Sequence, residues 1–459
     1  MPRFQKWVQL YYNYKTGARI LSSWFNKSSK MRISTYTTAI LIENKHTLFY
    51  NSLSGKFVVV KNYLLNTELL SIQDLLNRQK ELFVNLCNSG VLIEDDYDEI
   101  SEVRKRIELA ENNCNELIIH INPTLDCNFS CWYCYEKHVP NSFMTESVIS
   151  SVIKYISNTI SNNKIKRVEL GFFGGEPLLF FKKIILPILS TVNMLCEKDN
   201  INLSVNFTSN GYLINNTIIN YLSNYSCGFQ ITLDGYKDFH DRTRFHKPNK
   251  GSYDKIVKNI ISLASHSIDV IVRINYTSEN YESITRISQN FIGLPASCKK
   301  YIKFDLQRVW QDTIEKFDKT YNGVKDIRKL FRDSGFIVLD NYLLHDVRYP
   351  CYGDKINYVL INYDGNVFGC TARDFTKANS IGRITEDGVI EYNNVFNLRN
   401  SLKFSKETCL KCRIAPICGG GCKQIAYEAR NIDKCIYNYT SKDKDSIVID
   451  LFERYVLNI

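Results

Sequence analysis

The chain has 459 residues, of which 44% are hydrophobic, and it carries 15 cysteines and a formal net charge of +10. This length corresponds to about three globular domains of roughly 150 residues each, and the hydrophobic share excludes an intrinsically disordered chain. We recognise no signal peptide, and the most apolar run, Ile184–Leu189, is much shorter than a membrane-spanning helix requires. We therefore expect a cytoplasmic protein without a membrane partner, whose cysteines stay reduced and bind metal.

The positive charge is distributed along the chain, with only a local cluster near His246–Lys250. No nucleic-acid-binding motif is present, so DNA and RNA are not expected as partners. Two interpretations of the charge stay open: a solvated basic surface, and a surface that attracts an acidic peptide.

The first 115 residues contain no recognisable catalytic motif. Their patterning predicts three short strands, two helices and a final strand-like run, in the order 36–42, 47–51, 56–60, 67–76, 79–88 and 90–95. Such a small α+β module exposes a strand edge, and an exposed edge can accept an added peptide strand. A purely structural cap on the following domain is the alternative.

Strand-like and helix-like segments alternate between residues 116 and 320. Amphipathic segments such as 147–160 and 251–264 separate six strand-like runs, at 116–126, 165–173, 201–210, 228–235, 268–277 and 301–307. This alternation predicts an α/β fold with a parallel sheet and right-handed crossovers. Six such units suit a partial (β/α)6 barrel of the TIM type.

Three cysteines, Cys127, Cys131 and Cys134, follow the first of these strands with the spacing C-x3-C-x2-C. A four-iron cluster is normally held by four thiolates, so three clustered cysteines leave one iron open for chemistry. A zinc knuckle or a redox pair is the alternative, although a zinc site requires four ligands close together. The loop after a strand is also where barrel enzymes place their active sites.

The triplet, with the aromatic Tyr133 before its last cysteine, resembles the motif of the radical S-adenosylmethionine (radical SAM) enzymes. This resemblance implies a four-iron cluster whose open iron is chelated by the amino and carboxylate groups of S-adenosylmethionine (SAM). It also implies the reaction. The reduced cluster donates one electron to the sulfonium, and the resulting 5′-deoxyadenosyl radical abstracts a hydrogen atom from the substrate.

Two further motifs fit this resemblance. Gly174, Gly175 and Glu176 form a GGEP turn after the second strand, and by resemblance they hold the amino group of SAM, although GGE alone also suits an ordinary strand-to-helix turn. Asn210, in TSNG, ends the third strand, where polar groups of a barrel point into a shared mouth.

The fourth strand ends in TLDG. By the same resemblance, Thr232 and Asp234 bind the ribose hydroxyls, and Arg244 in the segment HDRTR pairs with the carboxylate of SAM. Arg242 is the alternative to Arg244. The histidine and aspartate of HDRTR are expected to brace this loop rather than to transfer protons.

Seven further cysteines lie in the last quarter of the chain: Cys351, Cys370, Cys409, Cys412, Cys418, Cys422 and Cys435. Their spacing, with Gly365 five residues before Cys370, resembles the SPASM domain, the cluster-binding extension of radical SAM peptide maturases. The resemblance implies one auxiliary four-iron cluster on Cys409, Cys412, Cys418 and Cys435, and a second on Cys351, Cys370 and Cys422.

The second auxiliary set is one ligand short, because the residues before Cys351 include His345 but no cysteine. Water, His345, another oxygen or a substrate thiolate then completes it. Zinc is the alternative metal for these sites. The cysteines outside the motifs are expected to be small buried apolar residues: Cys87, Cys114, Cys196, Cys227 and Cys298.

Taken together, the motifs resemble a peptide maturase that installs a thioether or carbon–carbon crosslink in a ribosomally synthesised precursor peptide. The N-terminal module resembles, in layout, the winged-helix domain that recognises the leader of such peptides. The implied partners are a precursor peptide with its leader and an electron donor, flavodoxin or ferredoxin. The implied domains are the module (1–115), the barrel (116–320), a linker (321–350), the SPASM domain (351–440) and a C-terminal helix (441–459).

Two other functions stay open. One is an anaerobic sulfatase-maturating enzyme, which oxidises a cysteine or serine to formylglycine. Relatives of that kind usually carry an aspartate base directly after the cysteine that corresponds to Cys370, where this chain has Thr371, and they usually lack a long segment before the triplet. The other is an iron–sulfur electron-transfer protein that never cleaves SAM.

Overall fold

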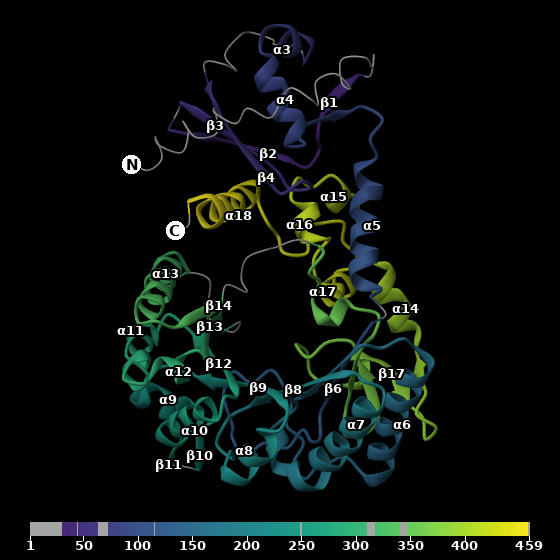
Figure 1. Cartoon of the computed structure of the whole chain (residues 1–459), viewed down its shortest axis with the longest axis vertical. Coiled ribbons are helices and arrows are strands. Elements are labelled where there is room, and N and C mark those ends of the chain that lie inside the picture. Colours follow the sequence, from purple (N-terminus) through teal and green to yellow (C-terminus); the bar gives the residue numbers. More distant parts are fainter. Residues whose placement is uncertain are drawn as a thin grey trace. The chain divides into compact units, whose positions relative to one another are not determined.

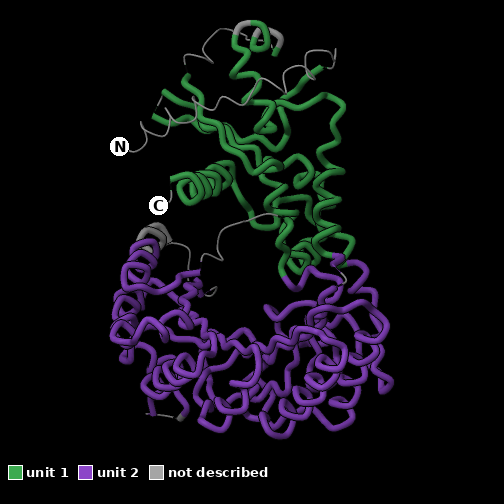
Figure 2. The backbone as a smooth tube through the Cα atoms, in the orientation of Figure 1, with its two compact units in different colours: residues 1–111, 343–351, 399–459 green, residues 112–342, 352–398 purple. Residues whose placement is uncertain are grey.

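The computed structural model describes residues 30–43, 45–62, 72–113, 115–247, 250–309, 317–339 and 347–457 (Figure 1). The chain forms two compact units, each built from separate stretches of sequence (Figure 2). Unit 1 comprises residues 1–111, 343–351 and 399–459, and unit 2 comprises residues 112–342 and 352–398. His345, Cys114 and the first half of the helix predicted at 67–76 lie outside the described residues.

Unit 2 is built on one large, mostly parallel sheet. Its strand order is β14-β13-β12-β9-β8-β7-β6-β15-β16-β17-β18, and every pair from β14 to β15 is parallel. The strands are β6 (Glu116–Ile121), β7 (Arg167–Phe172), β8 (Asn202–Ser209), β9 (Ser226–Leu233), β12 (Asp269–Tyr276), β13 (Ile302–Arg308), β14 (Ile337–Leu339), β15 (Tyr358–Ile361), β16 (Asn366–Phe368), β17 (Ser380–Ile384) and β18 (Ile390–Tyr392). The last three pairings are antiparallel.

Helices cover the outer face of this sheet. They are α6 (Glu146–Asn162), η3 (Pro177–Phe180), η4 (Phe181–Ile185), α7 (Leu186–Lys198), α8 (Asn216–Leu222), α9 (Lys237–Thr243), α10 (Tyr253–Ser265), α11 (Tyr281–Thr285), η5 (Ile287–Asn290), α12 (Ala296–Lys299), α13 (Phe317–Asp333) and most of α14 (Asn394–Ser401). The short helices η7 (Tyr352–Asp354) and η8 (Lys377–Asn379) also belong to unit 2. A two-stranded ribbon, β10 (Phe245–Lys247) with β11 (Lys250–Gly251), follows α9. Alternate strand residues such as Leu117, Ile119 and Ile121 point outward into one continuous apolar core with the helices.

The six strands predicted between residues 116 and 307 are confirmed as β6, β7, β8, β9, β12 and β13. Within the described residues the outer strands β14 and β18 do not pair with each other, so the sheet stays open, as a partial barrel requires.

The predicted linker at 321–350 is corrected by the structure, because its described part forms α13 and β14. Val324, Ile327 and Phe331 recur at helical spacing and are buried against the sheet, and β14 pairs in parallel with β13.

Unit 1 joins the N-terminal module to the end of the chain. The module contains the ribbon β1 (Met31–Ile33) with β5 (Leu92–Glu94), the antiparallel sheet β2 (Thr37–Ile42), β3 (His46–Asn51) and β4 (Lys56–Lys61), and the helices α3 (Ile72–Arg78), α4 (Lys80–Asn88) and α5 (Glu99–Glu111). The C-terminal part adds α15 (Glu407–Leu410), α16 (Ala415–Cys418), α17 (Lys423–Glu428), α18 (Ser441–Phe452) and η9 (Glu453–Leu457). The three strands predicted at 36–60 are confirmed.

The two parts of unit 1 share their apolar core. Tyr36 and Val103 of the module pack with Phe404 and Ala415 in one buried cluster, and Tyr50 packs with residues of α16 and α18 in another. The compact units therefore do not follow the domain boundaries expected from the sequence, since residues 352–398 extend the barrel sheet and residues 399–459 pack with the module.

Among the described residues, one helical stretch, Pro177–Lys198, is long and apolar enough to cross a membrane by length and composition. It contains the shorter apolar run Ile184–Leu189, which is too short to indicate this by itself. Ile184, Ile188 and Val192 of this stretch are fully buried in the core of unit 2. Packing in the core of unit 2 therefore accounts for these three apolar residues.

Candidate active site

The loop that carries the cysteine triplet, residues 122–143, begins directly after β6. It contains no helix or strand, but its two ends are joined by hydrogen bonds. Thr124 Oγ1 donates to the Ser142 carbonyl oxygen at 2.6 Å, and Leu125 N donates to Ser142 Oγ at 2.9 Å. Asp126 accepts from Asn141 N at 3.0 Å. The triplet therefore sits on a closed loop with fixed ends.

The GGEP turn packs backbone to backbone against the start of this cysteine loop. Gly175 N donates to the Thr124 carbonyl at 3.1 Å, and Glu176 N donates to the Asp126 carbonyl at 2.9 Å. A Cβ atom on Gly175 would lie 2.1 Å from the Asp126 oxygen, and one on Gly174, which has φ +99°, would lie 2.4 Å from the Thr124 oxygen. The two glycines are thus required by the close approach of the two segments.

Glu176 is fully buried and links the turn to the end of β8. Its carboxylate accepts from Leu178 N (3.1 Å), Ser209 Oγ (2.8 Å) and Asn210 N (2.8 Å). Burial raises its pKa to about 7, although these hydrogen bonds oppose the shift. A carboxylate that burial disfavours in this way gains most from a cationic partner, such as the amino group of a ligand.

Asn210 connects the same turn to the triplet. Its side-chain Nδ2 donates to Asn128 Oδ1 at 2.7 Å and approaches the sulfur of Cys127 at 3.9 Å. The third strand, the GGEP turn and the cysteine loop therefore meet at one point, as predicted for the mouth of a barrel.

Tyr133 joins the cysteine loop to the end of β9. Its hydroxyl donates to Asp234 Oδ2 at 2.5 Å and accepts from Arg244 Nη1 at 2.7 Å. Asp234 and Arg244 are both buried, and burial raises the pKa of Asp234 while Arg244 opposes that shift. Arg244 Nε is also buried and makes no hydrogen bond within the described part of the chain, so this guanidinium has a donor left for an anionic ligand.

The HDRTR loop is braced as predicted. His240 is fully buried, with Nδ1 accepting from Asp234 N (3.3 Å) and Nε2 near Ser252 Oγ (3.0 Å), and burial holds its pKa well below the usual value. The Asp241 carboxylate accepts hydrogen bonds from Ser252 N at 2.8 Å and from Tyr253 N at 2.9 Å. Arg242 is exposed and donates to a carbonyl of its own helix, which favours Arg244 as the anion-binding arginine.

A cavity of about 220 Å³ opens beside this network. Trp132, Tyr133 and Asp234 line one part of it, and Asn275 and Thr277, at the end of β12, line another. Thr232 is half-buried near the end of β9, two residues before Asp234. Of the two predicted ribose-binding residues, Asp234 lines this cavity and is hydrogen-bonded to Tyr133, whereas Thr232 does not line it.

The three triplet cysteines lie close enough to influence each other. Burial raises the pKa of Cys127 to about 12 and that of Cys134 to about 11, and Cys131 adds to both shifts. Cys127 and Cys131 are half-buried and Cys134 is exposed. Crowded thiols whose pKa is raised stay protonated unless cations stabilise their thiolates, which is what bound iron does. The donor set therefore fits a metal cluster.

Four of the C-terminal cysteines, Cys409, Cys412, Cys418 and Cys435, line a single cavity in unit 1, which we call the four-cysteine cavity. Burial raises the pKa of Cys418 to about 12 and that of Cys409 to about 11, and the neighbouring cysteines raise both further. These are the four residues predicted to share one auxiliary cluster. They fit it because bound iron stabilises crowded thiolates, as at the triplet.

The other predicted auxiliary ligands are Cys351, Cys370 and Cys422. Cys351 and Cys422 belong to unit 1 and Cys370 to unit 2, so their grouping stays a prediction. In the described ranges, no three His, Cys, Asp or Glu side chains are arranged to hold a single metal ion. A cubane does not need that arrangement, because each thiolate binds a different iron.

The remaining cysteines differ in burial. Cys196 and Cys298 are buried, as predicted, whereas Cys87 and Cys227 are half-buried.

The sequence reasoning missed a junction of hydroxyl groups in unit 2. Tyr135 OH donates to the Thr371 carbonyl at 2.9 Å, and Tyr352 OH lies 2.5 Å from Thr371 Oγ1. These three residues directly follow Cys134, Cys370 and Cys351 in the sequence. Their position next to predicted ligands is the signal that could have identified them.

Comparison with known proteins decides the family of this region. Residues 121–289 match the family model of the radical SAM superfamily. Residues 121–289 are a radical SAM domain. The match includes the cysteine triplet, the GGEP turn and Arg244.

Relatives extend the similarity beyond the radical SAM domain. The chain is 22% identical over 455 residues to the radical SAM cyclopropyl synthase TigE of Paramaledivibacter caminithermalis, covering 86% of this chain and 90% of the relative. It is 24% identical over 358 residues to a cysteine-type anaerobic sulfatase-maturating enzyme of Clostridium novyi, covering 72% and 91%. The solved structure of native anSMEcpe with bound AdoMet and Kp18Cys peptide has a TM-score of 0.57 at 18% identity, covering 75% of this chain and 100% of that one, which shows a shared fold.

Proposed function

We propose that this protein is a radical SAM peptide maturase that installs a crosslink, thioether or carbon–carbon, in a ribosomally synthesised precursor peptide in the cytoplasm. One observation carries the proposal: a chain with a radical SAM domain also has a separate cavity lined by four cysteines. A second cluster site of this kind suits an enzyme that passes electrons during substrate oxidation, with flavodoxin or ferredoxin as the external donor.

Different residues of the barrel would bind different groups of SAM. Cys127, Cys131 and Cys134 would hold the cluster, Glu176 with the two glycines of its turn would receive the amino group, and Arg244 would pair with the carboxylate. Bound together, the cluster and SAM would supply the one-electron chemistry by which a hydrogen atom is removed from the substrate. The chain itself contributes a closed loop and a buried pocket, which fix orientation and limit access of water.

The auxiliary sites would differ in how completely the chain ligates them. Cys409, Cys412, Cys418 and Cys435 give one cluster a full set of thiolates. Cys351, Cys370 and Cys422 give the other only three, and water, a side chain or a substrate thiolate would complete it. Coordination of a substrate cysteine would stabilise its thiolate and prepare it for thioether formation.

The N-terminal module offers a place for an extended peptide. A groove of about 1390 Å³ runs along β4 and α4 and is lined by Phe57, Val58 and Leu82 together with Lys56 and Lys80. In the order β2-β3-β4 the strand β4 is at the edge of its sheet, so its backbone suits the addition of a peptide strand. The lysines favour an acidic segment. These features support leader recognition by strand addition.

The sulfatase-maturating enzyme of Clostridium novyi, to which the chain is similar over 72% of its length, supports a second candidate, formylglycine formation. Against it stands Thr371, which is buried and whose side chain lies within hydrogen-bonding distance of Tyr352. A neutral threonine cannot act as the aspartate base expected there. We therefore favour crosslink formation.

Two experiments test the proposal. Anaerobically reconstituted protein should carry about three four-iron clusters, roughly twelve irons per chain, and should form 5′-deoxyadenosine from SAM and dithionite. Replacing the three triplet cysteines by alanine should abolish 5′-deoxyadenosine while leaving about eight irons. A protein that holds the clusters but never cleaves SAM would be an electron-transfer protein instead.

The substrate is tested by co-expression with the product of a short open reading frame beside the gene. A loss of about two mass units per crosslink, since two hydrogen atoms leave, supports the maturase. Oxidation of a sulfatase cysteine to formylglycine would support the alternative.

A further inference from the structure

The groove beside β4 has a second wall that comes from the far end of the chain. Leu451 of α18 and Tyr455 and Val456 of η9 line it opposite the strand and α4. Ile417, the residue directly before Cys418, lines it as well. The groove is therefore incomplete without the C-terminal helix and the segment that carries the C-terminal cysteines.

The cysteine-bearing segment 409–418 connects α18 to the strand module. Ile414 and Ile417 form one buried cluster with Val448 and Leu451 of α18 and with Tyr50 of β3. On the module side, Phe57 of β4 stacks on Tyr50 with ring centres 4.4 Å apart, and it meets Phe452 of α18 edge-on at 5.3 Å. Ile414 and Ile417 therefore connect segment 409–418 to both walls, while Phe57 and Phe452 join the walls directly.

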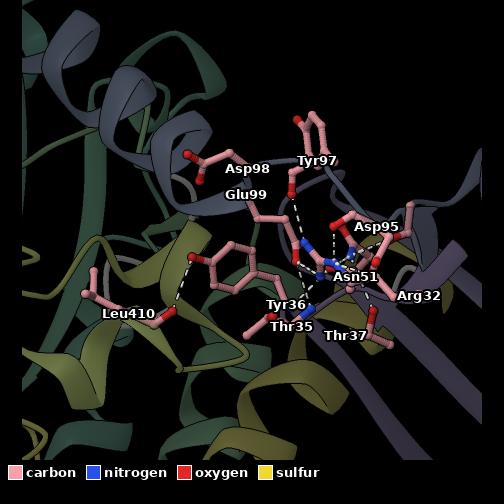
Figure 3. A network of polar contacts seen from close by, with 12 residues as sticks. Arg32, Thr35, Tyr36, Thr37, Asn51, Asp95, Tyr97, Asp98, Glu99 and Leu410 are labelled. Carbon is pink, nitrogen blue, oxygen red and sulfur yellow. Dashed lines mark hydrogen bonds and ion pairs between the residues drawn. The ribbon is translucent and has the colours of Figure 1, made fainter. Parts of the chain in front are cut away.

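Hydrogen bonds also join segment 409–418 to both α18 and the N-terminal module. Arg413 donates to Asp445 Oδ1 and to the Ser441 carbonyl of α18, both at 2.7 Å, while its own carbonyl accepts from Ser52 Oγ of the module at 2.6 Å. Tyr36, fully buried, points its hydroxyl at the Leu410 carbonyl, 3.4 Å away (Figure 3). Each of these bonds anchors a backbone segment that lies between predicted cluster ligands.

The supporting segment has little structure of its own. Its helices α15 and α16 contain four residues each, too few to be stable without outside support. Its cysteines Cys409, Cys412 and Cys418 converge with Cys435 on one cavity, and Tyr439, just before α18, and Lys444, in its first turns, line the same cavity. Metal binding at such a convergence supplies the free energy that orders the chain around it.

We propose that iron at the four-cysteine cavity holds α18 in place as the second wall of the groove, so that the groove is complete only in the cluster-loaded protein. This inference rests on the proposed iron–sulfur function and goes beyond it, because it gives an auxiliary cluster a role in binding an extended, acidic segment of the precursor peptide. The role requires no electron transfer.

Hydrogen–deuterium exchange on the full-length protein tests this. We would compare reconstituted wild type, the variant Cys409→Ala with Cys412→Ala, and, as a matched control, the variant with the three triplet cysteines replaced by alanine. Amides of residues 444–457 should exchange at least about tenfold faster in the first variant and at the wild-type rate in the control. Strands β6 to β9 should stay protected in all three proteins.

If the two-cysteine variant does not fold, wild type stripped of iron by a chelator replaces it, with β6 to β9 again reporting on global folding. Unchanged exchange of residues 444–457 after loss of the auxiliary iron overturns the inference. Failure of the proposed function appears separately, as wild type that forms no 5′-deoxyadenosine, and leaves the exchange result valid.

Discussion

Replacing Gly175 by alanine tests whether the GGEP turn positions the cysteine loop. A Cβ atom there would lie 2.1 Å from the Asp126 oxygen and 2.6 Å from its carbonyl carbon, so the turn has to move away. The movement breaks the hydrogen bonds from Gly175 N to Thr124 O and from Glu176 N to Asp126 O, which contribute roughly 0.5–1.5 kcal/mol each. With a total of about 1–3 kcal/mol, SAM affinity should fall roughly 5- to 150-fold.

The matched control is Gly293→Ala, the same chemical change at a position with nothing within 4 Å of the added atom. Neither glycine has a left-handed backbone, so only the available space differs. Anaerobic isothermal titration calorimetry would give SAM affinity, and iron analysis would show whether the cluster is retained. Equal SAM affinity for the two alanine variants would refute the steric argument.

Three further predictions follow from buried groups. Glu111→Ala removes the buried carboxylate that pairs with both Lys403 and Lys423 and should cost about 3–5 kcal/mol in urea unfolding. Glu407→Ala removes an exposed pair with Lys411 and should cost at most about 1 kcal/mol. Tyr133→Phe removes the hydroxyl between a buried carboxylate and a buried guanidinium, so SAM binding or stability should fall by about 1–3 kcal/mol. Burial raises the pKa of Glu176 from 4.5 to about 7, so the unfolded chain releases this proton at a lower pH than the folded protein does. Wild type without SAM should therefore lose roughly 3 kcal/mol of unfolding free energy between pH 4.5 and 7 relative to Glu176→Gln. Urea unfolding of both proteins across that range measures the difference. Equal losses of unfolding free energy in Glu111→Ala and Glu407→Ala would contradict the first prediction. Unchanged SAM binding and stability in Tyr133→Phe would contradict the second. Parallel dependence of stability on pH in wild type and Glu176→Gln would contradict the third.

The sequence predicts the barrel well because its signals are local. The six strands between Glu116 and Arg308 are short apolar runs separated by helical segments, and each motif lies at a strand end where the fold needs a loop. The meeting of the GGEP turn with the cysteine loop also agrees with the motif order. The segment expected as a linker differs, because Val324, Ile327 and Phe331 recur at helical spacing and are buried in the core of unit 2.

The architecture of unit 1 could not be predicted in the same way. Its core pairs Tyr36 and Val103 with Phe404 and Ala415, and no local pattern indicates which distant residue will cover a given apolar face. The hydroxyl junction around Thr371 is indicated in the sequence only weakly, because each of its three residues directly follows a cysteine. The network of Tyr133, Asp234 and Arg244 depends on side-chain positions that spacing alone does not define.

The shared core of unit 1 also affects how this protein is made. Tyr36 and Leu410 contact each other across 374 residues of sequence, and a ribosome adds roughly 5–20 residues per second, so the module waits on the order of 20–75 s for its partner. During that interval the strands β2 to β4 expose apolar surface that has no cover. The N-terminal module should therefore aggregate when expressed alone, and transplanting it to another enzyme would require moving the last 60 or so residues with it.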